Sequence, residues 1–283
     1  MLMNWLKTGL LLSLLTAFVL GIGYLAAGQQ GLVYALIFAA IMNFVGYFFS
    51  DKIALAAMHA EEVGPENELY QIVAELAQRA NLPMPRVYIS PEEAPNAFAT
   101  GRGPNHAAVC ATQGLLQVLD REEVAGVIGH ELTHVRHRDI LIQSIAATIA
   151  GAISVLGYMF MWGGGRRRDE GNPLIALLFI ILGPIAAGLI QAAISRQREY
   201  AADTGGAQLC GDPMYLARAL EKIHAYSRRI PLEVNPSFNS MFIAEPLNPM
   251  AQMANLFSTH PPLEARLMNL IGREATGYYR QVA

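Results

Sequence analysis

Two histidines and a glutamate lie close together in the segment His130-Glu131-Leu132-Thr133-His134. On a helix, residues four apart project from the same face about one turn apart, so both imidazoles can bind one metal ion. Glu131 lies about 100° round the helix from His130, where it can reach a metal-activated water without binding the metal. Because zinc lowers the pKa of such a water towards about 7 and a neighbouring carboxylate can take its proton, the pattern is typical of hydrolytic zinc sites.

The same five residues also occur by chance on solvated helices, so the neighbouring sequence decides between the two interpretations. Residues 124–129 are apolar and small, as a buried helix requires, whereas a histidine-bearing surface helix would be more polar. Asp120 is placed to begin this helix, with Glu123 in position to complete a capping box. The surroundings therefore favour a buried site.

A further metal ligand is available in residues 195–203. Glu199 and Asp203 are four residues apart and share one face of a predicted helix. One carboxylate can bind the metal while the other hydrogen-bonds a histidine ligand. Since a structural zinc site is closed by four protein ligands and needs no base, three ligands beside Glu131 favour catalysis over a purely structural role.

Charged residues are scarce, at 15% of the 283 residues against about 25% in typical soluble domains. Four windows contain no charged residue, and each is near the ~20 residues that cross a bilayer. They are Thr8–Gly28, Gly31–Ser50, Ile140–Gly165 and Gly171–Ser195. The sequence therefore predicts a membrane protein with an attached soluble domain.

The first two windows predict an uncleaved helical hairpin, residues 1–50, because the apolar run is longer than that of a signal peptide. Lys7 and Lys52 flank its outer ends, which places both ends in the cytoplasm by the positive-inside rule. The second pair, residues 140–195, is interrupted by Arg166–Arg168. We expect it to span, and the alternative is a hairpin that lies on the bilayer or only partly enters it. Either way, an even number of crossings leaves the histidines and Glu199 on the same membrane face.

The remaining soluble blocks, residues 51–139 and 196–283, are expected to fold together as the two parts of one catalytic domain. Helical periodicity predicts helices over 66–80, 213–229 and 262–271. Residues 86–90 are typical of a strand, and 97–100 can pair with 107–112 across a glycine-rich turn. The expected fold is mainly α with a small β-sheet.

The chain resembles a known family. The amino-terminal hairpin, the His130–His134 segment, the second apolar pair and Glu199-Tyr200-Ala201-Ala202-Asp203 are together similar to the HtpX-type membrane zinc metalloproteases. These are relatives of the CAAX prenyl proteases and of the mitochondrial OMA-type proteases. The likeness extends from the first hairpin through Arg266 and implies a zincin-like (gluzincin) metalloprotease domain fused to two transmembrane hairpins.

Two further segments carry the resemblance. Ser258-Thr259-His260-Pro261-Pro262, followed by Glu264 and Arg266, matches the carboxy-terminal motif of the family, and Asn96–Gly101 matches its substrate-edge segment. No departure occurs at the metal ligands or the base. The triple arginine of the second hairpin does not fit a simple four-span arrangement.

The resemblance implies one zinc ion per chain, bound by His130, His134 and Glu199. It assigns Glu131 as general base and acid, and Asp203 as the residue that orients a ligand histidine. His260 and Arg266 are candidates for stabilising the oxyanion or ordering the site, since a positive donor is most useful where negative charge develops. A structural role is the alternative for both.

The segment that resembles the substrate edge could bind a peptide as an added strand, which would make recognition largely independent of sequence. The alternative is an ordinary hairpin strand. Its candidate substrate-binding residues are Asn96, Ala97, Phe98, Ala99 and Thr100.

The expected function is an endopeptidase in protein quality control and stress response, which cleaves misfolded or damaged membrane proteins at the cytoplasmic face of the cell (inner) membrane. A narrow processing protease of the CAAX type is an alternative, although those enzymes are longer and use more spans to enclose a chamber. A second alternative is a non-catalytic, zinc-stabilised membrane scaffold. The net charge of −3 without a basic tract argues against a nucleic-acid partner, and the sequence makes no prediction of oligomeric state.

Overall fold

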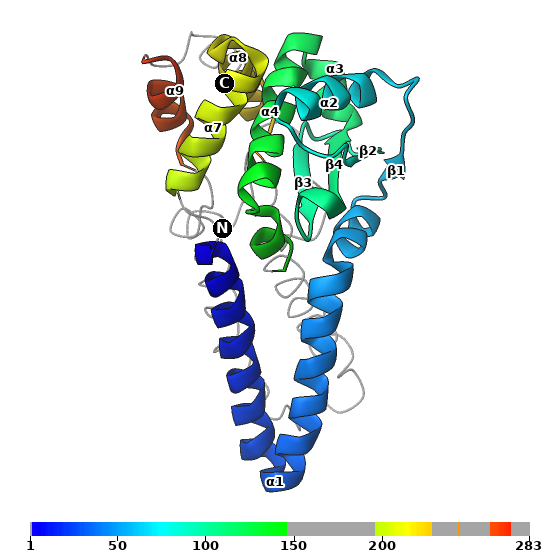
Figure 1. Ribbon diagram of the computed structural model, residues 1–283, viewed down its shortest axis with the longest axis vertical. Coiled ribbons are helices and arrows are strands. Elements are labelled where there is room, and N and C mark those ends of the chain that lie inside the picture. The colour runs from blue at the N-terminus through cyan, green and yellow to red at the C-terminus, as the bar shows by residue number, and fades with distance from the viewer. Residues whose placement is uncertain (1, 146–195, 228–242, 244–260, 273–283) are drawn as a thin grey trace, which may run out of the picture.

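The computed structural model describes residues 2–145, 196–227, 243 and 261–272. Figure 1 shows a long helical hairpin that extends from one end of a domain built of helices and a small sheet. The second apolar pair predicted over 140–195 lies outside the described residues, except that residues 140–145 are helical.

The hairpin is formed by α1 (Leu2–Ala57), in which two helices join at a sharp turn. The backbone leaves helical geometry at Ala27 and Gly28, and Gly28 takes a φ of +57°, which glycine adopts without steric cost. The two arms run back along each other in Figure 1. Asn43 Nδ2 of the second arm donates to Thr16 Oγ1 of the first at 2.9 Å, so a polar contact joins them. The amino-terminal segment thus forms the predicted helical hairpin.

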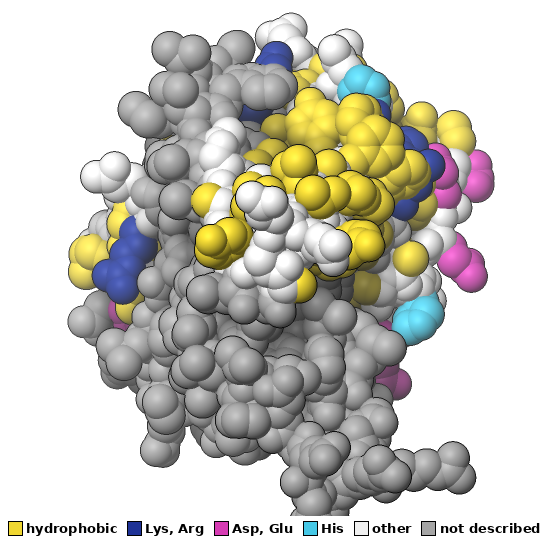
Figure 2. Space-filling model, turned by 90° about the horizontal axis from the view of Figure 1, so that it is seen from below, with side chains coloured by type: hydrophobic (Ala, Val, Ile, Leu, Met, Phe, Trp, Pro, Cys, Tyr) yellow, Lys and Arg dark blue, Asp and Glu magenta, His cyan; other side chains and the backbone are white. Residues whose placement is uncertain are grey.

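The second arm is suited to a bilayer. Residues Ala27–Ala57 form the one helix in the described part of the chain that is both long and apolar enough to span, with a mean hydropathy of 2.1 over its most apolar window. Most of its large hydrophobic side chains are exposed. Seen from below, hydrophobic side chains gather in a broad patch on the described surface, with Lys and Arg side chains beside it (Figure 2). The structure therefore supports one membrane helix, and the two spanning hairpins stay a prediction.

A four-stranded sheet lies in the domain beside the end of α1, in the order β1-β2-β4-β3. Strands β2 and β4 are parallel, whereas β3 and β4 form the antiparallel hairpin that the sequence predicts. This order leaves β3 at the edge of the sheet. The strands are β1 (Glu61–Glu62), β2 (Arg86–Ser90), β3 (Ala97–Gly101) and β4 (Ala107–Thr112), and the turn before β4 contains the 3₁₀ helix η1 (Pro104–His106).

The sheet is covered by helices whose boundaries follow local signals. Helix α2 (Glu68–Arg79) is capped by Asn67 and buries the five apolar residues at helical spacing. Helix α4 (Arg121–His137) begins with the predicted capping box between Asp120 and Glu123. The remaining helices are α3 (Gln113–Val118), α7 (Arg196–Cys210), α8 (Pro213–Ser227) and α9 (Leu263–Ile271).

Helix α4 lies at the centre of the domain. It packs against α2, α7, α8 and β3, so residues from both soluble blocks share one hydrophobic core. The apolar face of α4 is fully buried in that core, through Val127, Ile128 and Leu132. Described residues of both sequence blocks therefore pack into one core, and α4 and α7 lie side by side.

Candidate metal centre

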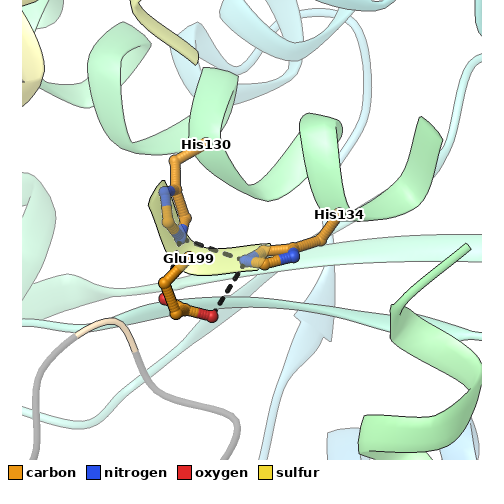
Figure 3. A group of neighbouring side chains, drawn as sticks. All are labelled: His130, His134 and Glu199. Carbon is orange, nitrogen blue, oxygen red and sulfur yellow. Dashed lines mark hydrogen bonds and ion pairs between the residues drawn. The ribbon is translucent and has the colours of Figure 1, made fainter. Parts of the chain in front are cut away.

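Helices α4 and α7 bring together His130, His134 and Glu199, all three buried. One potential ligand atom from each lies within 4.8 Å of the other two. Figure 3 shows both imidazoles and the carboxylate turned toward one another. The two Nε2 atoms are 3.2 Å apart, and His134 Nε2 lies 3.4 Å from Glu199 Oε1. Two imidazoles and a carboxylate form a donor set that zinc uses in open catalytic sites.

Glycines at the crossing of α4 and α7 make this convergence possible. A Cβ atom at Gly206 would lie 2.6 Å from the backbone nitrogen of His130, and one at Gly129 would lie 3.0 Å from the carbonyl oxygen of Gly206. No larger residue fits at Gly206 without moving a backbone. The close approach lets Glu199, two turns earlier on α7, reach the histidine pair.

A carboxylate lies close to the Nδ1 atom of each histidine. His130 Nδ1 lies 2.8 Å from Asp203 Oδ1, and His134 Nδ1 lies 3.3 Å from Asp139 Oδ2. A hydrogen bond at Nδ1 fixes the tautomer whose Nε2 carries the lone pair. Because both Nε2 atoms face Glu199, the orientation of the rings fits a metal at their centre.

The two histidines differ in proton affinity. Burial lowers the pKa of His130 to about 4, and the nearby Asp203 does not offset this. Burial also acts to lower the pKa of His134, but its hydrogen bonds with Asp139 and Glu199 outweigh burial and raise it to about 10. Before a metal binds, His134 is therefore the member of the pair that carries a proton at neutral pH.

Asp203 is itself held by Arg266 of α9. The guanidinium donates through Nε and Nη2 to the two carboxylate oxygens, at 2.9 and 2.5 Å, and through Nη1 to the carbonyl of Ile243 at 3.0 Å. Burial acts to raise the pKa of Asp203, but Arg266 outweighs burial and holds it at about 2. Since all three guanidinium nitrogens are engaged, this arrangement favours site ordering over oxyanion binding.

A sequence profile described as "Peptidase family M48" matches residues 64–274, a range that holds both histidines, Glu199, Asp203 and Arg266. The chain belongs to peptidase family M48.

Two curated relatives, each named "Protease HtpX homolog", match nearly the whole M48 chain. The one from Syntrophotalea carbinolica is 54% identical over 275 residues, covering 95% of this chain and 98% of the relative. The one from Burkholderia cenocepacia is 50% identical over 283 residues, covering 98% and 99%. The resemblance to HtpX-type proteases is therefore confirmed.

A solved structure shares the fold. The crystal structure of S. mikatae Ste24p matches with a TM-score of 0.52 at 19% identity, over 96% of this chain and 67% of that one. The family match, the His-His-Glu group and the apolar helix of α1 describe a membrane metalloprotease of family M48.

In this M48 peptidase, Glu131, which the resemblance assigns as the base, contacts the edge strand β3. The backbone N–H of Ala99 on β3 donates to Glu131 Oε2 at 2.9 Å. The alternate amides of the same strand also bond side chains: Ala97 N–H donates to Asn96 Oδ1 at 2.8 Å, and Gly101 N–H to Ser144 Oγ at 3.3 Å. The proposed substrate edge thus lies directly beside Glu131.

Sequence reasoning missed Asp139, the partner of His134. Arg138 ends α4 in a left-handed conformation, and the Asp139 amide donates back to the carbonyl of His134 at 3.0 Å, which turns the Asp139 side chain under the imidazole. Arg198 Nη1 of α7 then donates to Asp139 Oδ1 at 3.1 Å. An acidic residue directly after the end of the helix was the one available signal in the sequence.

The structure therefore brings together nearly all of the predicted site residues. His130, Glu131 and His134 share α4, Glu199 and Asp203 share α7, and Arg266 reaches them from α9. Asn96 and the β3 residues line the same region, and Asn96 Oδ1 also accepts from the Ile243 amide at 3.1 Å. His260 lies outside the described residues.

Proposed function

We propose that this chain is a zinc-dependent endopeptidase, with one zinc ion bound by His130, His134 and Glu199 and with Glu131 as general base and acid. The observation that carries the proposal is the buried convergence of three ligand atoms within 4.8 Å, with Glu131 on the same helix. Zinc in such a site supplies Lewis acidity, which polarises a peptide carbonyl and lowers the pKa of water.

The residues of the chain supply the remaining steps. Glu131 takes a proton from the attacking water and then delivers it to the leaving amine, which separates as a neutral group. The Ala99 amide orients the Glu131 carboxylate. Asp203 and Asp139 keep both imidazoles in the ligating tautomer, and Arg266 keeps Asp203 ionised and in place.

Polypeptide substrates would add to β3 as an extra strand. Residues Ala97–Thr100 belong to β3, and Asn96 directly precedes this strand. Among the described strands β3 pairs only with β4, so it forms an edge of the sheet, although its residues are buried. Main-chain hydrogen bonds give affinity without demanding particular side chains. Such recognition suits an enzyme that must accept many damaged proteins.

We further propose that the protein acts in quality control at the cell (inner) membrane, as a multi-pass protein with its site facing the cytoplasm. Lys7 and Lys52 at the outer ends of the α1 hairpin support this orientation through the positive-inside rule. Both ends of the hairpin lie toward the domain in Figure 1, so a spanning hairpin would leave the site beside the bilayer. Membrane proteins would then be concentrated near the site.

The experiment is cleavage of casein by the full-length protein in detergent with added zinc. Wild type should cleave, whereas Glu131→Gln should bind zinc equally and show no hydrolysis. Glu122→Gln makes the same change at an exposed position of α4 and should behave as wild type. Equal cleavage by wild type and Glu131→Gln would overturn the proposal. Cleavage of prenylated peptides alone would favour the narrow processing protease, and zinc binding without any hydrolysis would favour the scaffold.

A further inference from the structure

A cavity of about 480 Å³ opens where the second arm of α1 meets the turn between β3 and β4. One part of its wall is aromatic, from Phe44 and Phe48 of α1. Another is basic, from Lys52 of α1 and Arg102 of the turn. This cavity lies apart from the metal centre, and none of the residues assigned to catalysis lines it.

The aromatic and basic parts are arranged along the axis of the helix. Phe44, Phe48 and Lys52 are four residues apart and so follow one face of α1. At 1.5 Å per residue, Lys52 lies about 12 Å further along the helix than Phe44. Phe44 is 55% exposed and Phe48 is 41% exposed. In a membrane, the two rings would therefore face acyl chains while Lys52 reaches the level of the headgroups.

The two cations that bracket the opening are available to an anion. The Arg102 guanidinium lies over the Phe48 ring at 5.1 Å from its centroid, and Lys52 Nζ lies over the Phe49 ring at 5.5 Å. In the part of the chain that the structure describes, neither forms an ion pair with a carboxylate. The positive charge of both is therefore uncompensated there.

A third cation in the wall is already neutralised. Arg86 Nη2 bonds Asp51 Oδ2 at 2.7 Å, and Arg86 Nη1 donates to the Tyr88 hydroxyl at 3.1 Å. This pair closes one side of the cavity without adding net charge. The cavity thus carries two net positive charges, next to exposed aromatic rings at the end of an apolar helix.

We propose that this cavity binds the phosphate group of an anionic glycerophospholipid. Lys52 and Arg102 contact the phosphate, and an acyl chain runs down α1 over Phe48 and Phe44. On the face seen from below, Figure 2 shows Lys and Arg side chains beside the broad hydrophobic patch. A soluble anion would use the cations but not the aromatic wall, which is why we commit to a lipid. The proposal rests on α1 lying in the membrane and is independent of the protease activity.

The site would fix the substrate edge relative to the bilayer. Arg102 directly follows Gly101, the last residue of β3, so a lipid that binds Arg102 anchors the strand that carries the Ala99 amide. Damaged membrane segments would then meet β3 at a constant depth.

The test measures lipid retention by the full-length protein in detergent, using native mass spectrometry. Phosphatidylglycerol and phosphatidylcholine with identical acyl chains are added in equal amounts. Wild type should retain phosphatidylglycerol preferentially. Each basic residue near a membrane surface contributes about fivefold to the binding of acidic lipid, so Lys52→Gln with Arg102→Gln should weaken retention about 25-fold.

Two control variants keep the test decisive. Arg79→Gln with Arg121→Gln removes the same charge from α2 and α4 and should retain the lipid as wild type does. Lys52→Arg with Arg102→Lys preserves charge and should also retain it, which covers the case in which the glutamine variant fails to fold. Equal retention of both lipids by wild type, or equal loss in both neutralising variants, would overturn the proposal. Binding of inorganic phosphate without any retention of phosphatidylglycerol would show that the cavity binds free phosphate instead.

Discussion

Glu131 of α4 and Ala99 of the edge strand β3 are joined by one hydrogen bond, from the Ala99 amide to Glu131 Oε2 at 2.9 Å. The proposed base and the proposed substrate edge therefore share a contact. An amide that donates to this carboxylate is not available to the carbonyl of a bound peptide. A peptide that adds to β3 would therefore bond the amides on either side, while the Ala99 amide keeps the Glu131 carboxylate oriented toward the attacking water.

Replacing Ala99 by proline should remove the hydrogen bond to Glu131 without disrupting the fold. Proline has no N–H and is tolerated on edge strands where the amide points away from the partner strand. A hydrogen bond to a charged group contributes about 1.5–3 kcal/mol, so kcat/KM for casein should fall about 10- to 100-fold. Zinc content should stay at one ion per chain.

The matched control is Ala97→Pro, because the Ala97 amide contacts Asn96 and not Glu131. It should raise KM and leave kcat near that of wild type, whereas Ala99→Pro should lower kcat as well. An Ala99→Pro enzyme with wild-type kcat would contradict the shared-contact mechanism.

Zinc binding should release a proton from His134. The pKa of His134 is raised to about 10 in the metal-free protein and that of His130 is lowered to about 4, so at pH 7 only His134 is protonated. Zinc requires neutral imidazole, and the apparent affinity should therefore rise about tenfold per pH unit between about pH 6 and 9. Isothermal titration calorimetry in two buffers that differ in ionisation enthalpy measures the number of protons released when zinc binds.

Asp139→Asn tests whether the Asp139 carboxylate is a cause of the raised pKa of His134. It removes a carboxylate that raises the pKa of His134, so fewer protons should be released at pH 8 than in wild type. Zinc binding that releases no proton from wild type between pH 7 and 8 would show that His134 is already neutral.

Elements with local signals were predicted well from the sequence. The capping box of Asp120 and Glu123 marks the start of α4, and the periodicity of apolar residues predicts the buried face of α2. The spacing of His130 and His134 on one helix predicts that these two candidate ligands share one face. Glu199 and Asp203 could be paired as ligand and supporting carboxylate for the same reason, although their spacing did not say which was which.

Contacts between distant segments were not predictable in this way. Arg198 reaches Asp139 across 59 residues, and Arg266 reaches Asp203 across 63. Each contact depends on how closely α7 and α9 approach α4, which no local pattern encodes. A buried arginine in a carboxy-terminal motif is equally compatible with oxyanion binding and with site ordering until its partners are known.

Arg266→Lys should distinguish those two roles. Lysine keeps the charge but cannot bond both Asp203 oxygens and the Ile243 carbonyl at once. Residues that orient metal ligands typically contribute 10- to 100-fold to affinity, so zinc affinity should fall by about that factor. An oxyanion role predicts instead a lower kcat with unchanged zinc affinity. Arg218→Lys on α8, at a half-exposed arginine near Glu123, should change neither quantity.

The close crossing of α4 and α7 should be sensitive to a single methyl group at Gly206. A Cβ atom there would lie 2.6 Å from the backbone nitrogen of His130, so Gly206→Ala must push α7 away from α4 and carry Glu199 from the histidines. Overpacking of this kind costs about 1–3 kcal/mol, more than the ~1 kcal/mol that alanine gains over glycine in a helix. We expect a lower melting temperature, and a loss of zinc affinity that exceeds what the change in stability explains.

Gly205→Ala adds the same methyl group one residue earlier on the same helix. The nearest atoms to that Cβ belong to the side chain of Thr133, whereas those at Gly206 belong to backbone. It should therefore retain zinc affinity better than Gly206→Ala, measured by competition with a chromogenic chelator. If both variants bind zinc as tightly as wild type, the Glu199 position does not depend on the glycine crossing, and α7 must be held by its contacts with α8 and α9 instead.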